Sequence, residues 1–506
     1  MYKITCPYCF REFDDSDVMF RSEFVNLKEL DEFTSKYERN EAEVFSRNIS
    51  SVYKTWWTVR DTFTTSEMDP AAKEVQPYER PIIDPSSSTW QNYLLPIGNG
   101  DNYKSKYLIR DNDGMVAHIK LRRTALHDEI TCSRRVCPHC HNPLPENFGK
   151  TAIITIPIIG VTESGKTVYM SSLLRNISSY VVSVGYTGAI STSGVYSFRQ
   201  VNKVERDSKL PDPTNPELVQ QPLCFVMNKP LPGNALASYT VVLYDLAGEY
   251  FNLDPTQDIH VERKHRRPLL EHADGIILLI DPKQLIGKDE NNLAVAALNN
   301  IQSVLLDGSK KGTRANTPIA ICIPKADNDE FLNAFGADIQ ALATQGAEYD
   351  ARARKIPADQ YNALNDKLLE NMKMNSDNGV FPQTYNYEMS RFFAFSAVNG
   401  DLIREGVLTG RPFPQRIEDP LLWLFAKNGY CDVEGNLNYD IKCPNQNCGS
   451  YYTRYEEHQS PDPKRFLRSQ TYSTFNHVCR RCHCIFNVDD DGRVVGEFRF
   501  LTSEGR

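Results

Sequence analysis

The chain has 506 residues, which is enough for roughly two to four domains with a substantial buried core. It is 41% hydrophobic and 24% charged, as is typical of globular proteins, and its net charge of -8 excludes nucleic-acid binding driven by overall charge. The sequence lacks an apolar run of the roughly 18 residues that a membrane span needs, and its start lacks a secretory apolar region, so we expect a cytoplasmic protein.

The cysteines predict metal binding rather than disulfides, because eight of the 13 come in closely spaced pairs and the chain lacks a secretory signal. The first two pairs have the spacing C-P-x-C, which places two thiolates on a tight turn. Four thiolates complete a tetrahedral structural zinc site. We therefore predict one split zinc-binding module, residues 1–16 and 132–150. Its predicted ligands are Cys6, Cys9, Cys137 and Cys140, with Cys132 and His141 as alternatives.

Residues 17–131 separate these two pairs and predict an inserted α+β module. Helix-like apolar spacing at residues 24–49 is followed by strand-like residues 51–63. Residues 107–121 predict a hairpin that turns at Asp113-Gly114. The aromatic residues of this module predict a core rather than a base-stacking surface, since no basic stripe accompanies them.

From residue 151 onward strands and helices alternate, which predicts a mostly parallel sheet. Residues 160–167, with the sequence GVTESGKT, match the phosphate-loop pattern G-x-x-x-x-G-K-[ST] at every specified position. The two glycines let backbone N–H groups surround a polyphosphate at the start of a helix, expected at residues 168–180. The pattern assigns phosphate binding to Gly160, Ser164, Gly165 and Lys166, and Mg²⁺ binding to the hydroxyl of Thr167.

The connection at residues 183–212 carries no firm periodicity, and the strand expected after it, at residues 222–227, reads as a sheet edge. The next strand, residues 239–244, ends in Asp245-Leu-Ala-Gly248. A carboxylate at that strand end can hold hydrated Mg²⁺ opposite Thr167, and Gly248 can donate its N–H to a γ-phosphate.

Two further buried strands are expected at residues 274–281 and 317–324, with a helix at residues 292–306 between them. The second strand ends in Lys325-Ala-Asp327. The lysine stem can cover a purine ring, and the carboxylate can accept hydrogen bonds from the N1 and N2 groups of guanine. The alternative is a loop with ordinary surface charges. Polar helical residues 329–369 precede a last strand, residues 391–397, which ends in Ser396-Ala397 behind the expected base position.

Residues 431–506 predict a zinc ribbon, because two short cysteine knuckles are separated by strand-like, aromatic sequence. Such a ribbon is mostly structural and otherwise contacts protein or nucleic acid. Arg480 and Arg481 favour nucleic acid, whereas the acidic residues 489–491 oppose it. The predicted ligands are Cys443, Cys448, Cys479 and Cys482, with His477, His483 and Cys484 as alternatives at one corner.

In their order along the chain, the motifs of residues 151–430 resemble the G motifs of Ras-like GTPases of the TRAFAC class. Two short stretches, SGKTVYM from Ser164 and RIEDPLLWL from Arg416, more narrowly resemble bacterial double-GTPases, predicted parts of biological conflict systems. The resemblance implies a Ras-like P-loop NTPase fold of the α/β class, with helices on both faces of the sheet. It also implies a switch in which Mg²⁺-GTP orders two loops. The motifs are residues 160–167, Asp245-x-x-Gly248, Lys325-x-Asp327 and Ser396-Ala397.

The resemblance implies a switch threonine that senses Mg²⁺ and the γ-phosphate. By position this is Thr214, with Thr187 and Thr192 as rivals, and a plain solvent-facing turn residue is an equal alternative. Soon after the second expected switch, residues 263–267 read RKHRR. They form either a solvated helix face or a surface for a protein partner that is exposed according to nucleotide state.

Two departures from the family pattern bear on activity. Glu249 stands where Ras-like enzymes commonly place a water-orienting glutamine, and its charge would repel the γ-phosphate, so we predict slow hydrolysis. Pro324 stands where an asparagine is usual, which keeps ATP open as the nucleotide.

The sequence therefore predicts a Mg²⁺-dependent GTP-binding switch, residues 151–430, flanked by two zinc modules, with a role in bacterial conflict or antiviral defence. Its expected cofactors are GTP, Mg²⁺ and two Zn²⁺. Its expected partner is a protein, and nucleic acid at the ribbon is a second candidate. The alternatives are an ATPase on the same loop and a zinc-ribbon scaffold with a nearly inactive nucleotide site. The predicted catalytic residues are Lys166, Gly248, Glu249 and Thr214.

Overall fold

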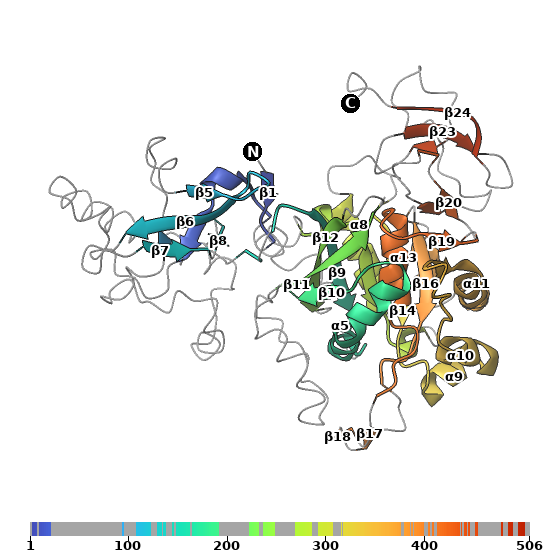
Figure 1. Ribbon diagram of the computed structural model, residues 1–506. Helices are drawn as coiled ribbons and strands as arrows, with labels where there is room; N and C mark the ends of the chain where they lie inside the picture. The colour runs from blue at the N-terminus through green and yellow to red at the C-terminus, as the bar shows by residue number, and fades with distance from the viewer. Residues whose placement is uncertain are drawn as a thin grey trace. The chain divides into compact units, whose positions relative to one another are not determined.

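The computed structural model of the chain falls into two compact units (Figure 1). Unit 1 contains residues 1–153 and 215–224, and unit 2 contains residues 154–214 and 225–506. The described residues are 3–7, 10–21, 94–95, 108–122, 129–133, 135–137, 144–145, 148–161, 164–191, 222–231, 236–247, 269–285, 292–306, 315, 317–375, 379–384, 386–387, 389–398, 403–404, 407–408, 412–435, 437, 440–442, 444–445, 451–453, 477–478, 484–488 and 494–500.

A seven-stranded sheet with the order β10-β11-β12-β9-β13-β14-β16 forms the centre of unit 2 (Figure 1). β13 is parallel to both β9 and β14, and β14 is parallel to β16. Parallel strands are buried on both faces and therefore need continuous apolar sequence. The predicted mostly parallel sheet is confirmed. The strands are β9 (Ala152–Gly160), β10 (Ala189–Ser191), β11 (Leu223–Pro230), β12 (Leu236–Ala247), β13 (Ile276–Leu279), β14 (Ile319–Ile323) and β16 (Ser390–Ala394).

The edge of this sheet differs from the expectation. The strand read as the edge, β11, has the short strand β10 paired antiparallel on its outer side. β10 contains only three residues and lies in the connection that carries no firm periodicity. Its pairing depends on β11 rather than on a pattern of its own, so the expectation that β11 forms the edge is wrong.

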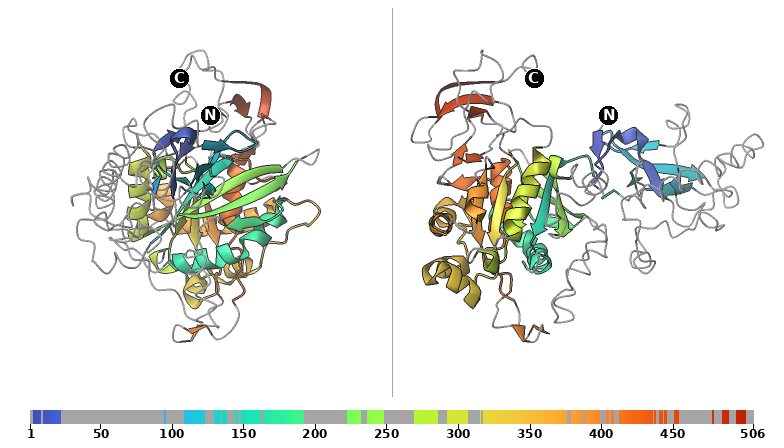
Figure 2. Two further views of the ribbon diagram at one scale, coloured as in Figure 1. Left: turned by 60° about the vertical axis from the view of Figure 1, so that its left-hand side comes forward. Right: turned by 180° about the vertical axis from the view of Figure 1, so that it is seen from behind.

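Helices cover both faces of the sheet (Figure 2). On one face, Tyr169 of α5 stacks on Phe395 with ring centroids 4.8 Å apart, and Trp423 of α13 packs on Phe393 at 5.6 Å. On the other face, buried side chains of α8, α11 and α12 join those of β13, β14 and β16 in one continuous apolar cluster. The helices are α5 (Lys166–Ser183), α8 (Leu293–Leu305), α11 (Ala358–Met374), α12 (Val380–Thr384) and α13 (Asp419–Lys427).

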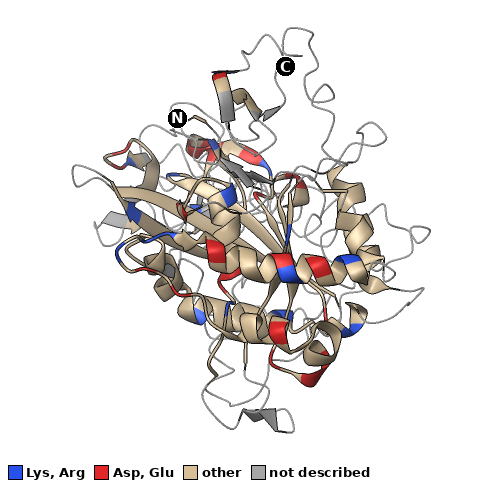
Figure 3. Ribbon diagram, turned by 90° about the vertical axis from the view of Figure 1, so that its right-hand side faces the viewer, with Lys and Arg blue, Asp and Glu red and all other residues tan. Residues whose placement is uncertain are grey.

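The polar stretch expected to be helical at residues 329–369 contains α9 (Asp329–Phe335), α10 (Ala337–Thr344) and most of α11. Gly336, with a φ of 83°, separates the first two, because a left-handed glycine ends one helix and lets the chain begin another at a new angle. α11 carries both acidic and basic residues along its length (Figure 3), whereas α9 and α10 contain acidic residues but no Lys or Arg.

Unit 1 consists of small antiparallel sheets. The predicted hairpin at Asp113-Gly114 is confirmed: β5 and β6 pair antiparallel, and Gly114 has a φ of 83°. The Asp111 carboxylate fixes the turn, since Oδ1 accepts from the backbone N–H groups of Asp113 (2.9 Å) and Met115 (3.1 Å). The strands are β1 (Lys3–Thr5), β2 (Glu12–Asp14), β3 (Met19–Arg21), β4 (Leu94–Leu95), β5 (Leu108–Arg110), β6 (Val116–Arg122), β7 (Glu129–Cys132) and β8 (Arg135–Val136), with a 3-10 turn η1 (Asp15–Asp17).

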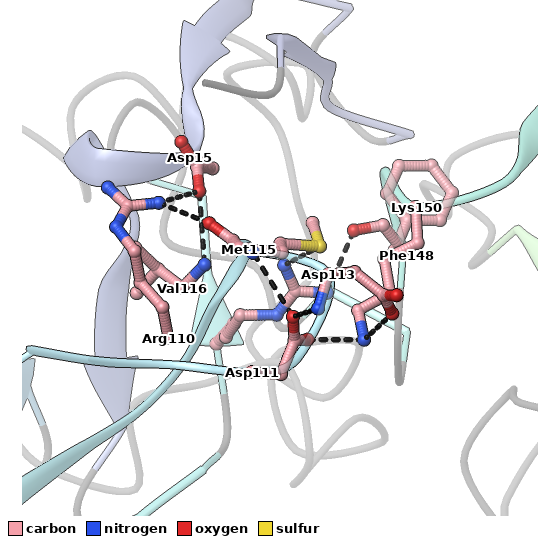
Figure 4. Close-up of polar contacts among 10 residues, drawn as sticks. Asp15, Arg110, Asp111, Asp113, Met115, Val116, Phe148 and Lys150 are labelled. Carbon is pink, nitrogen blue, oxygen red and sulfur yellow. Dashed lines mark hydrogen bonds and ion pairs between the residues drawn. The ribbon is translucent and has the colours of Figure 1, made fainter.

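Buried polar side chains connect the parts of unit 1 (Figure 4). Asp15, fully buried, accepts hydrogen bonds from Arg110 Nη1 (2.8 Å) and from the backbone N–H of Val116 (3.0 Å). Arg135 donates to the carbonyl of Phe148 (2.8 Å), and burial lowers the pKa of its guanidinium to about 10. These bonds join η1, next to the first cysteine pair, to the hairpin of the expected insertion, so the two regions share one core.

The remaining elements are short. In the part of the chain that the structure describes, no helix is long and apolar enough to cross a membrane. The C-terminal segment contains a two-stranded sheet, β20-β21, and a three-stranded antiparallel sheet, β22-β23-β24. The elements not yet named are η6 (Pro282–Leu285), β15 (Ile356–Pro357), β17 (Ile403–Arg404), β18 (Val407–Leu408), β19 (Val433–Glu434), β20 (Asp440–Lys442), β21 (Tyr451–Thr453), β22 (His477–Val478), β23 (Cys484–Val488) and β24 (Val494–Phe500).

Candidate functional site

The predicted motifs lie at one edge of the parallel sheet, where the strands that carry them end. Leu279 of β13 lies opposite Gly160 of β9 and opposite Cys322 of β14, so these three strands end at the same level. β16 continues the row, because Ala394 lies opposite Ile323. The carboxyl ends of parallel strands are the usual ligand-binding edge of an open α/β sheet.

The phosphate loop leaves the end of β9 and leads into α5. A Cβ added to Gly160 would lie 2.4 Å from Ser164 Oγ and 2.9 Å from Lys166 Cβ, so the loop closes only around a glycine. Gly165 has a φ of 73°, which glycine adopts readily, and it directly precedes the first residue of α5. The start of α5 therefore presents backbone N–H groups and a positive helix end to a bound anion. Thr162 and Glu163 lie outside the described residues.

Lys166 connects the phosphate loop to β12. Its Nζ lies 2.6 Å from Oδ1 of Asp245 and also donates to the carbonyl of Leu246. The two side chains are 7% and 12% exposed, so this pair of opposite charges is largely shielded from water. The structure thus brings the predicted phosphate lysine and the predicted Mg²⁺ carboxylate together, although they lie on α5 and β12. Gly248 and Glu249 lie outside the described residues.

Lys325 lies beside the phosphate loop from the other side. Its Cε is 4.0 Å from the place where Gly165 would carry a Cβ. Its Nζ lies 2.6 Å from Oδ2 of Asp281, a buried residue just after β13. Sequence reasoning did not select Asp281 as a site residue. The signal available in the sequence was an aspartate just after a buried strand. The next strand along the chain leads to Lys325.

The loop after β14 is held by neighbouring backbone groups. Ala326 donates its N–H to the carbonyl of Phe395 (3.1 Å), which joins the loop to the end of β16. Gln340 Nε2 donates to the carbonyls of Ala326 (3.0 Å) and Asn328 (3.1 Å). Asp327, half-buried, therefore lies in a loop that is fixed on both sides.

The Ser396-Ala397 turn is tied to two other segments. Ser396 is buried and exchanges backbone hydrogen bonds with Gln415, at 3.1 and 2.8 Å. The carbonyl of Ala397 accepts from Ser172 Oγ of α5 at 3.1 Å. The turn thereby lies next to the helix that begins at the phosphate loop, on the side where its sequence motif predicts it.

Thr187, one of the rival switch threonines, lies at the wrong end of α5. This helix has 18 residues, so its length is roughly 27 Å, and it begins at the phosphate loop. Thr187 follows its far end, where its N–H donates to the carbonyl of Asn228 (2.8 Å). The structure therefore argues against Thr187. Thr192 and Thr214 lie outside the described residues.

The RIEDPLLWL stretch is part of the core around the start of α13. Arg416 Nε lies 2.7 Å from Oδ2 of Asp419, and Arg416 also donates to the carbonyls of Leu342 (3.3 Å) and Gln360 (3.1 Å). Burial, together with the nearby charge of Asp419, raises the pKa of the Glu418 carboxyl to about 8. This stretch connects α13 to neighbouring elements and carries no residue of the site edge described above.

The predicted zinc ligands are only partly described. Cys6 and Cys137 are buried, and the turn after Cys6 is closed by hydrogen bonds of Phe10 N–H to the Cys6 carbonyl and of Cys6 N–H to the Arg11 carbonyl, both 3.0 Å. Among the described residues, no group of three or more His, Cys, Asp or Glu side chains gathers as a metal site. The two zinc sites remain predictions. The ligands outside the described residues are Cys9, Cys140, Cys443, Cys448, Cys479 and Cys482.

Comparison with protein families matches residues 154–369 to the model of the Double-GTPase 2 family. No curated protein matches the chain. Among solved structures, sup35 complexed with GMPPNP is 10% identical with a TM-score of 0.23, over 58% of this chain and 47% of that chain. The S. cerevisiae Ski7 GTPase-like domain bound to GTP is 15% identical with a TM-score of 0.23, over 54% of this chain and 50% of that one. This chain spans about half the length of these solved structures.

Proposed function

We propose that residues 154–369, which match the Double-GTPase 2 model, form a P-loop GTPase domain that binds Mg²⁺-GTP and acts as a nucleotide-controlled switch. One observation carries the proposal. The glycine-dependent phosphate loop, the Lys166–Asp245 pair and Lys325 all lie at the carboxyl edge of one parallel sheet.

The residues at this edge suit both parts of the ligand. The space at Gly160 that a Cβ would fill lets the loop backbone approach a polyphosphate closely. Asp245 and Thr167 offer the carboxylate and hydroxyl oxygens that Mg²⁺ prefers. When bound, Mg²⁺ would neutralise charge on the phosphate oxygens. Lys166 would then exchange its contact with Asp245 for the β- and γ-phosphates, which leaves Asp245 for the metal ion.

Hydrolysis by in-line attack of water depends here mainly on positioning and on charge stabilisation. Lys166 and the N–H groups of the loop stabilise charge on the transferred phosphoryl group, and Gly248 donates a further N–H. Glu249 orients water poorly because its charge repels the γ-phosphate. We therefore propose slow turnover by the isolated protein, with Thr214 as the switch threonine.

Nucleotide preference is the first test. Affinities for GTP and ATP in the presence of Mg²⁺ should favour GTP, since Asp327 can accept from N1 and N2 of guanine and adenine lacks these donors. Asp327→Ala should reduce GTP affinity by roughly tenfold to a hundredfold and leave ATP affinity unchanged. A preference for ATP, or an unchanged GTP affinity in Asp327→Ala, supports the ATPase that Pro324 favours.

Turnover is the second test. Multiple-turnover phosphate release should be slow in the wild type and abolished in Lys166→Ala, the control for contaminating enzymes. Glu249→Gln should accelerate release, because it removes the charge next to the γ-phosphate. If GTP binds tightly and no release exceeds that of Lys166→Ala, the scaffold alternative replaces the enzyme.

The flanking cysteine pairs extend the proposal to two zinc modules. Cys443 and Cys448 fall between the paired strands β20 and β21, and Cys479 and Cys482 fall between β22 and β23. Loops between paired strands are where ribbon knuckles occur. We propose that a protein partner binds according to nucleotide state, with residues 263–267 as a candidate surface and nucleic acid at the ribbon as a second candidate partner. We also propose a role in bacterial conflict or antiviral defence, which the resemblance to double-GTPases supports.

A further inference from the structure

We propose that Asp281 is a positioning residue that holds Lys325 in place to receive a purine ring. This inference rests on the proposed nucleotide-binding function and deepens it. The carboxylate that orients the base-covering lysine lies just after the neighbouring strand β13 and belongs to none of the four sequence motifs.

Asp281 is itself held in a fixed orientation. Its side chain is 3% exposed, and Oδ1 accepts from the backbone N–H of Lys283 (2.9 Å) at the start of η6. The other oxygen, Oδ2, lies 2.6 Å from Lys325 Nζ. A buried carboxylate fixed by the backbone and paired with one cation is a strong electrostatic anchor, because little water competes for it.

Lys325 needs such an anchor for two reasons. A lysine side chain has four rotatable bonds, so holding it in one conformation costs rotamer entropy. Its backbone is also in the left-handed region, with a φ of 60°, which is unfavourable for a residue with a Cβ. The preceding residue, Pro324, has no side-chain donor or acceptor that could steady the loop. Backbone hydrogen bonds fix the loop itself, and the ion pair with Asp281 fixes the orientation of the lysine side chain.

The geometry leaves one side of Lys325 available to a ligand. Its head is fixed at Asp281, its Cε lies 4.0 Å from the Cβ position of Gly165, and the side chain is still 37% exposed. A stem held in this way offers a flat apolar surface beside the phosphate loop. This apolar surface can pack on adenine or guanine, whereas Asp327 can accept hydrogen bonds only from the N1 and N2 donors of guanine.

Because Lys325 would contact any purine ring and Asp327 only guanine, Asp281→Asn should affect GTP and ATP equally. The asparagine keeps an oxygen for the Lys283 N–H but removes the charge that holds Lys325. Calorimetric titration of the full chain with Mg²⁺ should show GTP and ATP affinities reduced by the same factor, about tenfold, with their ratio unchanged. The affinity for inorganic triphosphate, which has no base, should stay within twofold of the wild type.

A double-mutant cycle tests whether Asp281 acts through Lys325. In a Lys325→Ala background, Asp281→Asn should cause no further loss of GTP affinity. The matched control is Lys283→Gln, since Lys283 lies on the same turn, is 55% exposed and pairs with Glu330 at 3.0 Å. This control should bind both nucleotides as the wild type does. Lys325→Met, which keeps the stem and removes the charged head, should reproduce the equal loss and serves if Asp281→Asn fails to fold.

Three outcomes overturn the inference. One is unchanged GTP affinity in Asp281→Asn and Lys325→Met. Another is an equally large loss from Asp281→Asn when Lys325 is already alanine, which indicates a purely structural role. The third is a parallel loss of triphosphate affinity, which places the effect on the phosphate loop. A wild-type chain that binds neither GTP nor ATP overturns the proposed function as well, and is distinguished by the wild-type titration alone.

Discussion

The sheet of unit 2 and the small sheets of unit 1 are stabilised by different means. In unit 2, apolar side chains from strands and helices form one continuous cluster that includes Leu298, Ile321 and Leu368. In the described part of unit 1, the strands have seven residues or fewer and few apolar side chains are buried, so the buried charged groups Asp15 and Arg135 make up a larger share of the interior than buried charges do in unit 2. Burial of apolar area is therefore the main source of stability in unit 2, whereas unit 1 depends on specific polar bonds and, as we propose, on zinc.

The carboxyl groups of Asp15 and Glu418 show when a buried carboxyl stabilises the folded state and when it destabilises it. Asp15 Oδ2 accepts hydrogen bonds from a guanidinium and from a backbone N–H, so its buried charge is paired with a cation. Glu418 is 7% exposed, and its pKa is raised to about 8 by burial, with Asp419 adding repulsion. Removing the charge should therefore have opposite effects at these two positions.

The largest expected effect is the loss of zinc from unit 1. Structural zinc contributes on the order of 10 kcal/mol in small domains, and the described residues of unit 1 bury few apolar side chains that could replace it. Chelation or Cys6→Ser should remove hydrogen-exchange protection from β1, β2 and β6 in the full chain, while β13 and β14 stay protected. Cys322→Ala, at a buried cysteine of the sheet, should leave the zinc content unchanged. Protection of β6 that survives verified loss of zinc would show that zinc does not stabilise unit 1.

A smaller effect of the opposite sign is expected at Glu418. In the unfolded chain this carboxyl releases its proton near its ordinary pKa of 4.5, and in the folded chain only near 8. Between these values the folded state binds more protons, so the stability of unit 2 should fall as pH rises from about 4.5 to about 8. Glu418→Gln should remove this slope and stabilise unit 2 by about 4 kcal/mol at pH 8, with little gain near pH 4.5.

Thermal unfolding at several pH values, followed in unit 2, measures this effect. The matched control is Glu370→Gln, because Glu370 is 63% exposed in a surface ion pair with Lys367. Its pH slope should equal that of the wild type. If Glu418→Gln destabilises unit 2 at pH 8, the Glu418 carboxyl stabilises the folded state, as we expect of the Asp15 carboxyl in unit 1.

Sequence reasoning succeeded where chemistry is local. The buried parallel strands appear as apolar runs in the sequence. Residues at or beyond the strand ends, such as Lys166, Asp245 and Lys325, belong to motifs that each lie within one short stretch of chain. The structure brings these residues to one sheet edge, as the order of strands and loops predicts. Their roles in binding and catalysis stay predictions that the experiments above address.

The remaining features depend on contacts between distant segments. Asp281 meets Lys325 across 44 positions of sequence, and neither residue alone signals the pair. β10 has three residues whose pairing is decided by β11, and the burial of Glu418 follows from packing around α13. The hairpin at Asp113-Gly114 could be predicted, but its bond to Asp15 spans 95 positions. Periodicity and motifs carry no information on such contacts.

The smallest expected effect is at Asp15, and it tests whether unit 1 depends on its polar bonds. Asp15→Ala leaves the buried N–H of Val116 without its carboxylate acceptor, so the local stability of unit 1 should fall by about 2 kcal/mol. Asp15→Asn keeps an acceptor oxygen and loses only the charge toward Arg110, so about half that loss is expected. Exchange of the Val116 amide in the full chain measures both. Asp113→Asn is the control, because Asp113 is 66% exposed and its ion pair with Lys150, at 3.3 Å, should contribute less than about 0.5 kcal/mol. If Asp15→Ala changes this exchange no more than Asp113→Asn does, the apolar side chains alone hold unit 1 together, and the two units are stabilised in the same way.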